Sequence, residues 1–154
     1  MRKTAIVAAL VVWALLGCGQ QTQDPGKQAM ALIEKGAEHF KKKEYDLALE
    51  SYKKALELNP KSAVAYNMMG MAYRFKFEQS RSQELKNQEI AAFAKAIEID
   101  PTYWVAMINL GVTYYHQGDK AKAAPLFKKA MELKPDHPEK GEMEKRIAEG
   151  EKKP

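Results

Sequence analysis

Three segments of this chain end in the same pattern, an apolar residue, Glu, a second apolar residue, a polar residue and Pro. The endings fall at Pro60, Pro101 and Pro135, and the last two prolines lie 34 residues apart. A self-similar period of this length is typical of arrays in which each repeat is one supersecondary unit that stacks on its neighbours. Ala, Leu, Lys, Glu and Met are plentiful between the prolines, whereas Gly and Pro are sparse, so the units are predicted to be helical. The pattern therefore favours an all-α chain of stacked hairpins.

The third segment resembles the tetratricopeptide repeat most fully. The signature slots of that repeat are occupied in order by Met107, Leu110, Gly111, Tyr114, Ala123, Phe127, Ala130 and Pro135. The resemblance implies a short right-handed solenoid of three helix-turn-helix repeats. We expect the repeats over residues 29–62, 63–103 and 104–137, with a capping helix and a tail over 138–154.

Each repeat has a glycine in its first helix and an aromatic residue in its second. The glycines would let the two helices of a hairpin approach closely, and the aromatic rings would fill the layer between hairpins. The glycines are Gly36, Gly70 and Gly111, and the aromatic residues are Tyr52, Phe93 and Phe127.

The second repeat is seven residues longer than the period, because Pro60 and Pro101 lie 41 residues apart. The surplus falls within residues 77–87, between its two helices. Seven residues are close to two helical turns, so the insertion can lengthen the helices without rotating their buried faces. The alternative is an exposed loop. Glu89 also stands where the family has alanine, which predicts either looser packing in this hairpin or a partner for the carboxylate.

The first 17 residues have the anatomy of a signal peptide: basic residues Arg2 and Lys3, then an apolar run too short to span a bilayer. The sequence Leu-Leu-Gly-Cys at residues 15–18 resembles the lipobox of bacterial lipoproteins. The resemblance implies cleavage between Gly17 and Cys18, lipidation of Cys18 and attachment to the cell envelope, at the inner or the outer membrane. Residues 18–28 are expected to form a flexible tether. The alternatives are a secretory signal with a chance cysteine and a free thiol within the domain.

We predict no nucleic-acid partner despite the formal charge of +5, because Lys and Glu alternate along most of the chain, as on solvated helical faces. The three histidines have no metal-ligand spacing, and no nucleophilic triad or phosphate-binding loop is visible. We therefore predict a protein that is not an enzyme, with no catalytic residues, no metal site and no cofactor.

In this family the first helices of successive hairpins line a concave groove that receives a peptide or helix from a partner. The resemblance assigns to this groove Ile33, Ala37, Phe40, Asn67, Met71, Arg74, Ile108, Val112 and Tyr115. The mostly apolar set suits an amphipathic helix or an extended apolar segment. The alternatives are that the C-terminal helix, or a second copy of the chain in a homo-oligomer, covers these residues.

These features together predict a membrane-anchored adaptor that collects other envelope proteins during assembly of a pilus, a secretion apparatus or another envelope complex. Two other functions stay open. One is a lipid-tethered regulator that docks an enzyme such as a peptidase, and the other is a holdase for exported apolar segments.

Overall fold

A computed structural model of the protein describes residues 24–152, and within these residues it contains helices and no strand. Six helices form three hairpins, and a seventh follows them. The first hairpin is α1 (Pro25–Lys41) with α2 (Tyr45–Leu58), the second is α3 (Ala63–Ser80) with α4 (Gln83–Ile99), and the third is α5 (Trp104–His116) with α6 (Lys120–Leu133). The last helix is α7 (Lys140–Glu151). The predicted all-α solenoid of three hairpins with a capping helix is confirmed.

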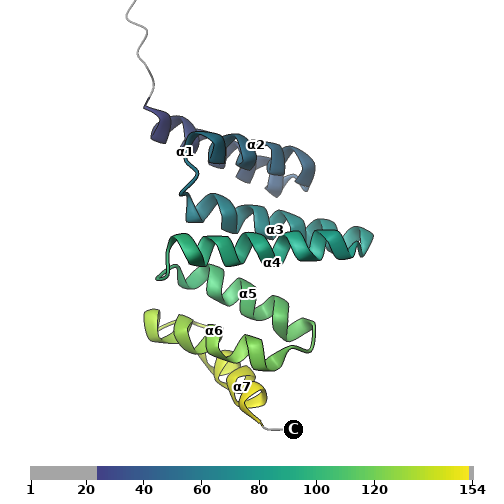
Figure 1. The fold of residues 1–154 in the computed structure, drawn as a ribbon, viewed down its shortest axis with the longest axis vertical. Helices are drawn as coiled ribbons and strands as arrows, with labels where there is room; N and C mark the ends of the chain where they lie inside the picture. The colour runs from purple at the N-terminus through teal and green to yellow at the C-terminus, as the bar shows by residue number, and fades with distance from the viewer. Residues whose placement is uncertain (1–23, 153–154) are drawn as a thin grey trace, which may run out of the picture.

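The hairpins are stacked in chain order, with the first described helices and α7 at opposite ends of the stack (Figure 1). Each helix packs mainly against the helices next to it in the chain, and α1, α3 and α5 also contact one another in sequence. This arrangement places the first helix of every hairpin along one side of the stack. It is the side on which the family resemblance places the groove.

The first helix begins earlier than the sequence predicts. Asp24 caps α1 by accepting a hydrogen bond from the Gly26 amide at 2.9 Å, and Pro25 occupies the first helical position, where its missing N–H costs nothing. Residues 25–28, expected within the flexible tether, are therefore helical. The signal peptide over residues 1–17 and most of the tether lie outside the described residues.

In the core of each hairpin, a glycine of the first helix contacts an aromatic ring of the second, so each ring also packs inside its own hairpin as well as in the predicted layer between hairpins. Tyr52, Phe93 and Phe127 are fully buried, and a β-carbon on Gly70 would lie 2.5 Å from the Phe93 ring. Real β-carbons do not approach other atoms so closely, so the two helices of the hairpin can pack at this separation only with glycine there. The same relationship holds in the other two hairpins.

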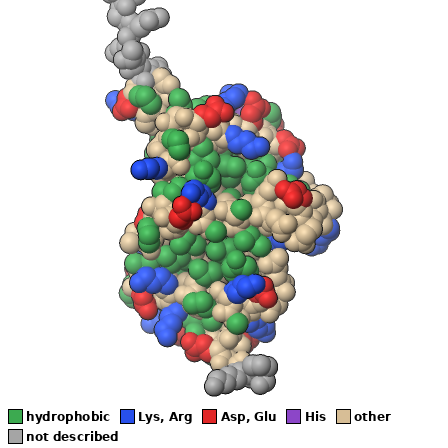
Figure 2. Space-filling view, in the orientation of Figure 1, with side chains coloured by type: hydrophobic (Ala, Val, Ile, Leu, Met, Phe, Trp, Pro, Cys, Tyr) green, Lys and Arg blue, Asp and Glu red, His purple; other side chains and the backbone are tan. Residues whose placement is uncertain are grey.

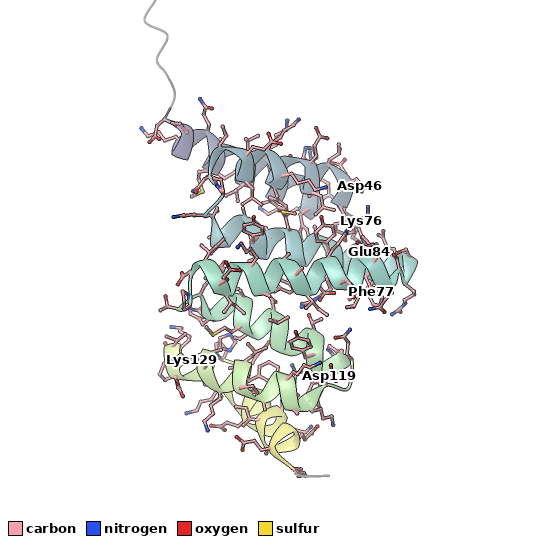
Figure 3. The ribbon with its side chains drawn as sticks, viewed as in Figure 1. Asp46, Lys76, Phe77, Glu84, Asp119 and Lys129 are labelled. Atoms are coloured by element: carbon pink, nitrogen blue, oxygen red, sulfur yellow. The ribbon has the colours of Figure 1, made fainter. Side chains whose placement is uncertain are left out.

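The seven surplus residues of the second repeat extend its helices, which is the first of the two alternatives above. α3 has 18 residues and α4 has 17, compared with 13 in α5 and 14 in α6. The end of this hairpin consequently projects past its neighbours, and Figure 3 shows Lys76, Phe77 and Glu84 together at the projecting end. We refer to residues 76–86 as the hairpin extension.

The capping helix closes the far end of the stack by packing on the last hairpin. Met143 of α7 is buried in a cluster with Phe127 and Ala123 of α6, and Ile147 packs against the same cluster. α7 therefore covers apolar surface that the third hairpin would otherwise expose.

Candidate functional site

The nine predicted groove residues occupy equivalent positions on α1, α3 and α5. Ile33 and Asn67 are buried, at 7% and 4% exposure, and the other seven are half-buried. These seven divide into residues held by other parts of the protein and residues that contribute to an accessible apolar surface.

Ile33 and Asn67 are interior residues. Ile33 belongs to the apolar cluster between the first two hairpins. Asn67 accepts a hydrogen bond from the side-chain amide of Asn109 at 2.9 Å, which joins α3 to α5. Neither side chain is available to a partner in this conformation, because each is already packed or bonded within the solenoid.

Arg74 is engaged in a network of hydrogen bonds rather than presented to a ligand. Its Nε donates to Glu89 at 2.8 Å, and its Nη2 donates to the Asn109 carbonyl at 2.7 Å and to the Thr113 hydroxyl at 2.9 Å. Lys86 also pairs with Glu89, at 2.6 Å, and the Glu89 carboxylate is fully buried. This network joins the second hairpin to the third. Glu89 stands where the family has alanine, and of the two predicted possibilities, looser packing or a paired carboxylate, the structure shows the paired carboxylate.

α7 holds the C-terminal end of the predicted groove. The Tyr115 hydroxyl donates to Glu149 at 2.7 Å, Lys120 pairs with the same carboxylate at 2.7 Å, and the Arg146 guanidinium lies 5.0 Å from the centre of the Tyr115 ring. The hydrogen bonds from Lys120 and Tyr115 lower the pKa of Glu149 to about 2. Ile108 and Val112 pack against the apolar cluster that includes Met143. The C-terminal helix therefore packs against the groove residues of the third hairpin. This agrees with the alternative in which that helix covers part of the predicted groove.

Among the predicted groove residues, the half-buried apolar ones on the first two hairpins are Ala37, Phe40 and Met71. Phe40 packs edge-on against Tyr45 and Phe75, with ring centres 5.5 and 5.3 Å away. Ala37 and Met71 take the same place on α1 and α3, and the cluster around α7 does not include them. The accessible apolar part of the predicted groove therefore lies on the first two hairpins.

A cleft of about 610 Å³ lies between the hairpin extension and the C-terminal end of α5. Phe77, Arg81 and Lys86 come from the extension, whereas Val112 and His116 come from α5. The sequence pattern alone assigns none of the three extension residues to a site. The signal that could have found them is the insertion itself, because a hairpin longer than its neighbours must leave a step beside the shorter one.

The face shown in Figure 2 carries hydrophobic side chains with basic and acidic ones scattered among them. Across residues 24–152 no group of three or more metal-ligating side chains comes together, and no helix in this range is both long and apolar enough to cross a bilayer. Gly17 and Cys18, the predicted cleavage and lipidation residues, lie outside that range.

Solved structures of similar shape are domains of this same repeat. The TPR domain of Arabidopsis OM64 superimposes with a TM-score of 0.70 at 23% identity, covering 81% of this chain and 98% of that one. The first TPR of Spaghetti (RPAP3), bound to the HSP90 peptide SRMEEVD, gives a TM-score of 0.69 at 22% identity, covering 80% of this chain and 93% of that one. At these identities the likeness supports the fold.

Sequence relatives differ greatly in length. The photosystem I assembly protein Ycf3 of Rippkaea orientalis is 28% identical over 153 residues, covering 88% of this chain and 82% of that protein. The protein O-mannosyl-transferase TMTC1 of Mus musculus is 30% identical over 98 residues, which is 64% of this chain. The chain spans only 10% of that transferase and 6% of a Xenopus laevis relative, tetratricopeptide repeat protein 37, which is 35% identical over 100 residues and 64% of this chain.

Profiles of the tetratricopeptide repeat match three stretches of the chain, at residues 29–62, 51–90 and 104–137. The first and last agree with the repeat boundaries read from the prolines, and the middle one begins within α2 and runs into α4. The matches, the solved structures and the stacked hairpins agree, and the chain belongs to the tetratricopeptide-repeat family.

Proposed function

We propose that this protein is a lipid-anchored adaptor of the bacterial cell envelope that holds a peptide or helix of a partner protein against α1 and α3. The observation that carries the proposal is the half-buried apolar surface at Ala37 and Met71, on first helices that contact each other. An apolar surface of this kind binds the apolar face of an amphipathic helix or an extended segment. Met71 also adapts its shape to different partners, because its side chain is unbranched and flexible.

Two relatives support a protein-binding role. The RPAP3 domain is bound to a peptide in its solved structure, and Ycf3 is named for the assembly of photosystem I. Their partners are not transferred to this chain. The envelope setting rests on Cys18 and the residues before it, and the partner would belong to a pilus, a secretion apparatus or another envelope complex.

The groove is tested with Ala37→Glu combined with Met71→Glu. The two carboxylates would have to lose water against the apolar face of a partner, which is strongly unfavourable for an unpaired charge. We expect the variant to keep its helicity and to lose the stoichiometric partner that co-purifies with the parent from detergent-solubilised envelopes. Leu47→Glu with Ala94→Glu is the matched control, because it adds the same charges at exposed residues of α2 and α4. Undiminished capture by the folded double variant would contradict the proposed groove.

The anchor is tested separately with Cys18→Ser. The parent should incorporate radioactive fatty acid and partition into detergent, whereas the variant should stay unlabelled, because serine lacks the thiol that is lipidated. An unlabelled parent would refute the anchored part of the proposal without affecting the groove. A partner that proves to be a hydrolase would instead favour a regulator, and a broad set of unfolded clients would favour a holdase.

A further inference from the structure

The hairpin extension builds one wall of the cleft beside α5, and this wall is cationic and aromatic. The Phe77 ring has Lys86 Nζ 4.0 Å from its centre and the Arg81 guanidinium 5.7 Å from it. Such contacts orient cations over the face of an aromatic ring. The opposite wall is formed by the last turns of α5, including Val112, His116 and Gln117.

The charges of the cleft do not balance within the protein. Arg74, Arg81 and Lys86 line it, and the acidic groups that face them are Glu78 in the lining and Glu89 beneath it. Glu89 pairs with Arg74 and Lys86. Among residues 24–152, no carboxylate lies within ion-pair distance of the Arg81 guanidinium. Arg81 is thus the cation of this cleft that still lacks an anionic partner.

The backbone at Arg81 is also unusual. This residue ends α3 in the left-handed conformation, with φ of 56° and ψ of 22°, where glycine is the common choice. A side chain with a β-carbon is disfavoured in this region. Among residues 24–152, Lys43 is the other non-glycine residue with a positive φ, and Arg81 is the one of the two that lines the cleft.

We propose that this cleft is a second docking site, which takes an acidic side chain from an extended segment of a partner protein. The guanidinium of Arg81 donates two parallel N–H hydrogen bonds to the carboxylate, while Phe77 and Val112 contact the apolar atoms of the same segment. A volume of about 610 Å³ lies within the range of about 300–1,000 Å³ typical of ligand pockets. A concave site of this size favours a peptide over a lipid surface. The cleft shares Arg74 and Val112 with the predicted groove, whereas Ala37 and Met71 lie outside its lining.

The test uses the full chain, isotope-labelled for NMR, and a capped hexaglutamate peptide as the probe. A capped hexaglutamine peptide controls for contacts that do not depend on charge. We expect hexaglutamate, and not hexaglutamine, to shift the amide signals of Arg81, Lys86, His116 and Gln117. Arg81→Gln should weaken binding by about tenfold, as expected for loss of a charged pair. Lys53→Gln on the exposed surface of α2 removes the same charge and should leave the affinity unchanged.

Arg81→Gly separates binding from stability. Glycine suits the left-handed backbone, so this variant should melt at a higher temperature than the parent and yet bind hexaglutamate as weakly as Arg81→Gln. Arg81→Gln should still capture the partner that the Ala37→Glu, Met71→Glu variant loses, which distinguishes failure of the cleft from failure of the groove. Equal binding by parent and Arg81→Gln would overturn the proposal, as would shifts spread evenly over all surface lysines. Phosphatidylglycerol vesicles that perturb the cleft amides when hexaglutamate does not would also overturn it, in favour of membrane contact.

Discussion

Arg74 on α3 donates a hydrogen bond to the fully buried carboxylate of Glu89 on α4, with Nε and Oε1 2.8 Å apart. Thr113 of α5 donates to the same oxygen at 2.6 Å. Three helices from two repeats thus meet at one carboxylate, which stands where the first and third repeats have Ala48 and Ala123. A buried carboxylate is tolerated here because cations and a hydroxyl satisfy its lone pairs.

Glu89→Ala should destabilise the protein by about 3–5 kcal/mol, because it leaves Arg74 and Lys86 without their shared partner. Arg74→Met combined with Glu89→Ala should cost less than the sum of the two single changes, since the double variant leaves no unpaired Arg74 guanidinium. Urea unfolding of the parent, both single variants and the double variant measures this coupling. Additive losses would show that the network does not act as a unit.

Gly70→Ala should destabilise the protein by about 1–3 kcal/mol, because the new β-carbon would lie 2.5 Å from the Phe93 ring and force the helices apart. Gly141→Ala in α7 is the matched control, since no atom beyond the adjoining residues and the backbone of the helix itself lies within 4 Å of that β-carbon, and alanine favours helix. Thermal melting should show opposite shifts for the two variants. A neutral Gly70→Ala would contradict the close packing of this hairpin.

Tyr52→Phe should stabilise the protein by about 1 kcal/mol. The Tyr52 hydroxyl is the buried side-chain polar atom of the described residues that finds no hydrogen-bond partner, and an unsatisfied buried group is costly. Phe93 and Phe127 fill the same place in the other hairpins without a hydroxyl. Burial also raises the pKa of Tyr52 to about 12, so the parent should lose stability between about pH 10 and 12, where only the unfolded chain ionises readily. Chemical unfolding at pH 7 and pH 11 tests both effects, and the stability gain from Tyr52→Phe should be larger at pH 11.

The attachment of α7 should weaken in acid. The pKa of Glu149 falls from its ordinary value near 4.5 to about 2 in the folded protein. A lowered pKa of a carboxyl contributes stability that is present above about pH 4.5 and is lost as the pH falls towards 2. The melting temperatures of the parent and Glu149→Gln should therefore differ at pH 7 and converge by about pH 2. Glu144→Gln, on the exposed surface of the same helix, controls for general acid effects, and a difference that persists at pH 2 would contradict the assignment.

The sequence predicts most of the fold because the features that build it are periodic. The prolines mark the ends of the hairpins, and the glycine in each first helix, such as Gly70, allows the two helices of a hairpin to approach closely. The early start of α1 was missed because its signal is local, an Asp24 cap followed by a proline within a polar stretch. Such a cap matters only once a helix is known to follow.

The candidate site is predicted less completely, since it depends on contacts between residues far apart in the chain. Arg74 was assigned to the groove from its repeat position, but its partners Glu89 and Thr113 are 15 and 39 residues away. The cleft at Arg81 arises from the step between a long hairpin and a short one. Neither property can be read from a single helix.

The stacking order of the hairpins has a mechanical consequence. Each hairpin contacts mainly its neighbours in the chain. A force applied at the two ends of the stack would therefore be transmitted through every junction between hairpins in turn. Small tilts at successive junctions would add up to a change in overall length while every helix stays intact. Polar contacts across the junctions would oppose such tilts: Arg74 and Thr113 join the second hairpin to the third, and Lys76 pairs with Asp46 between the first and second hairpins.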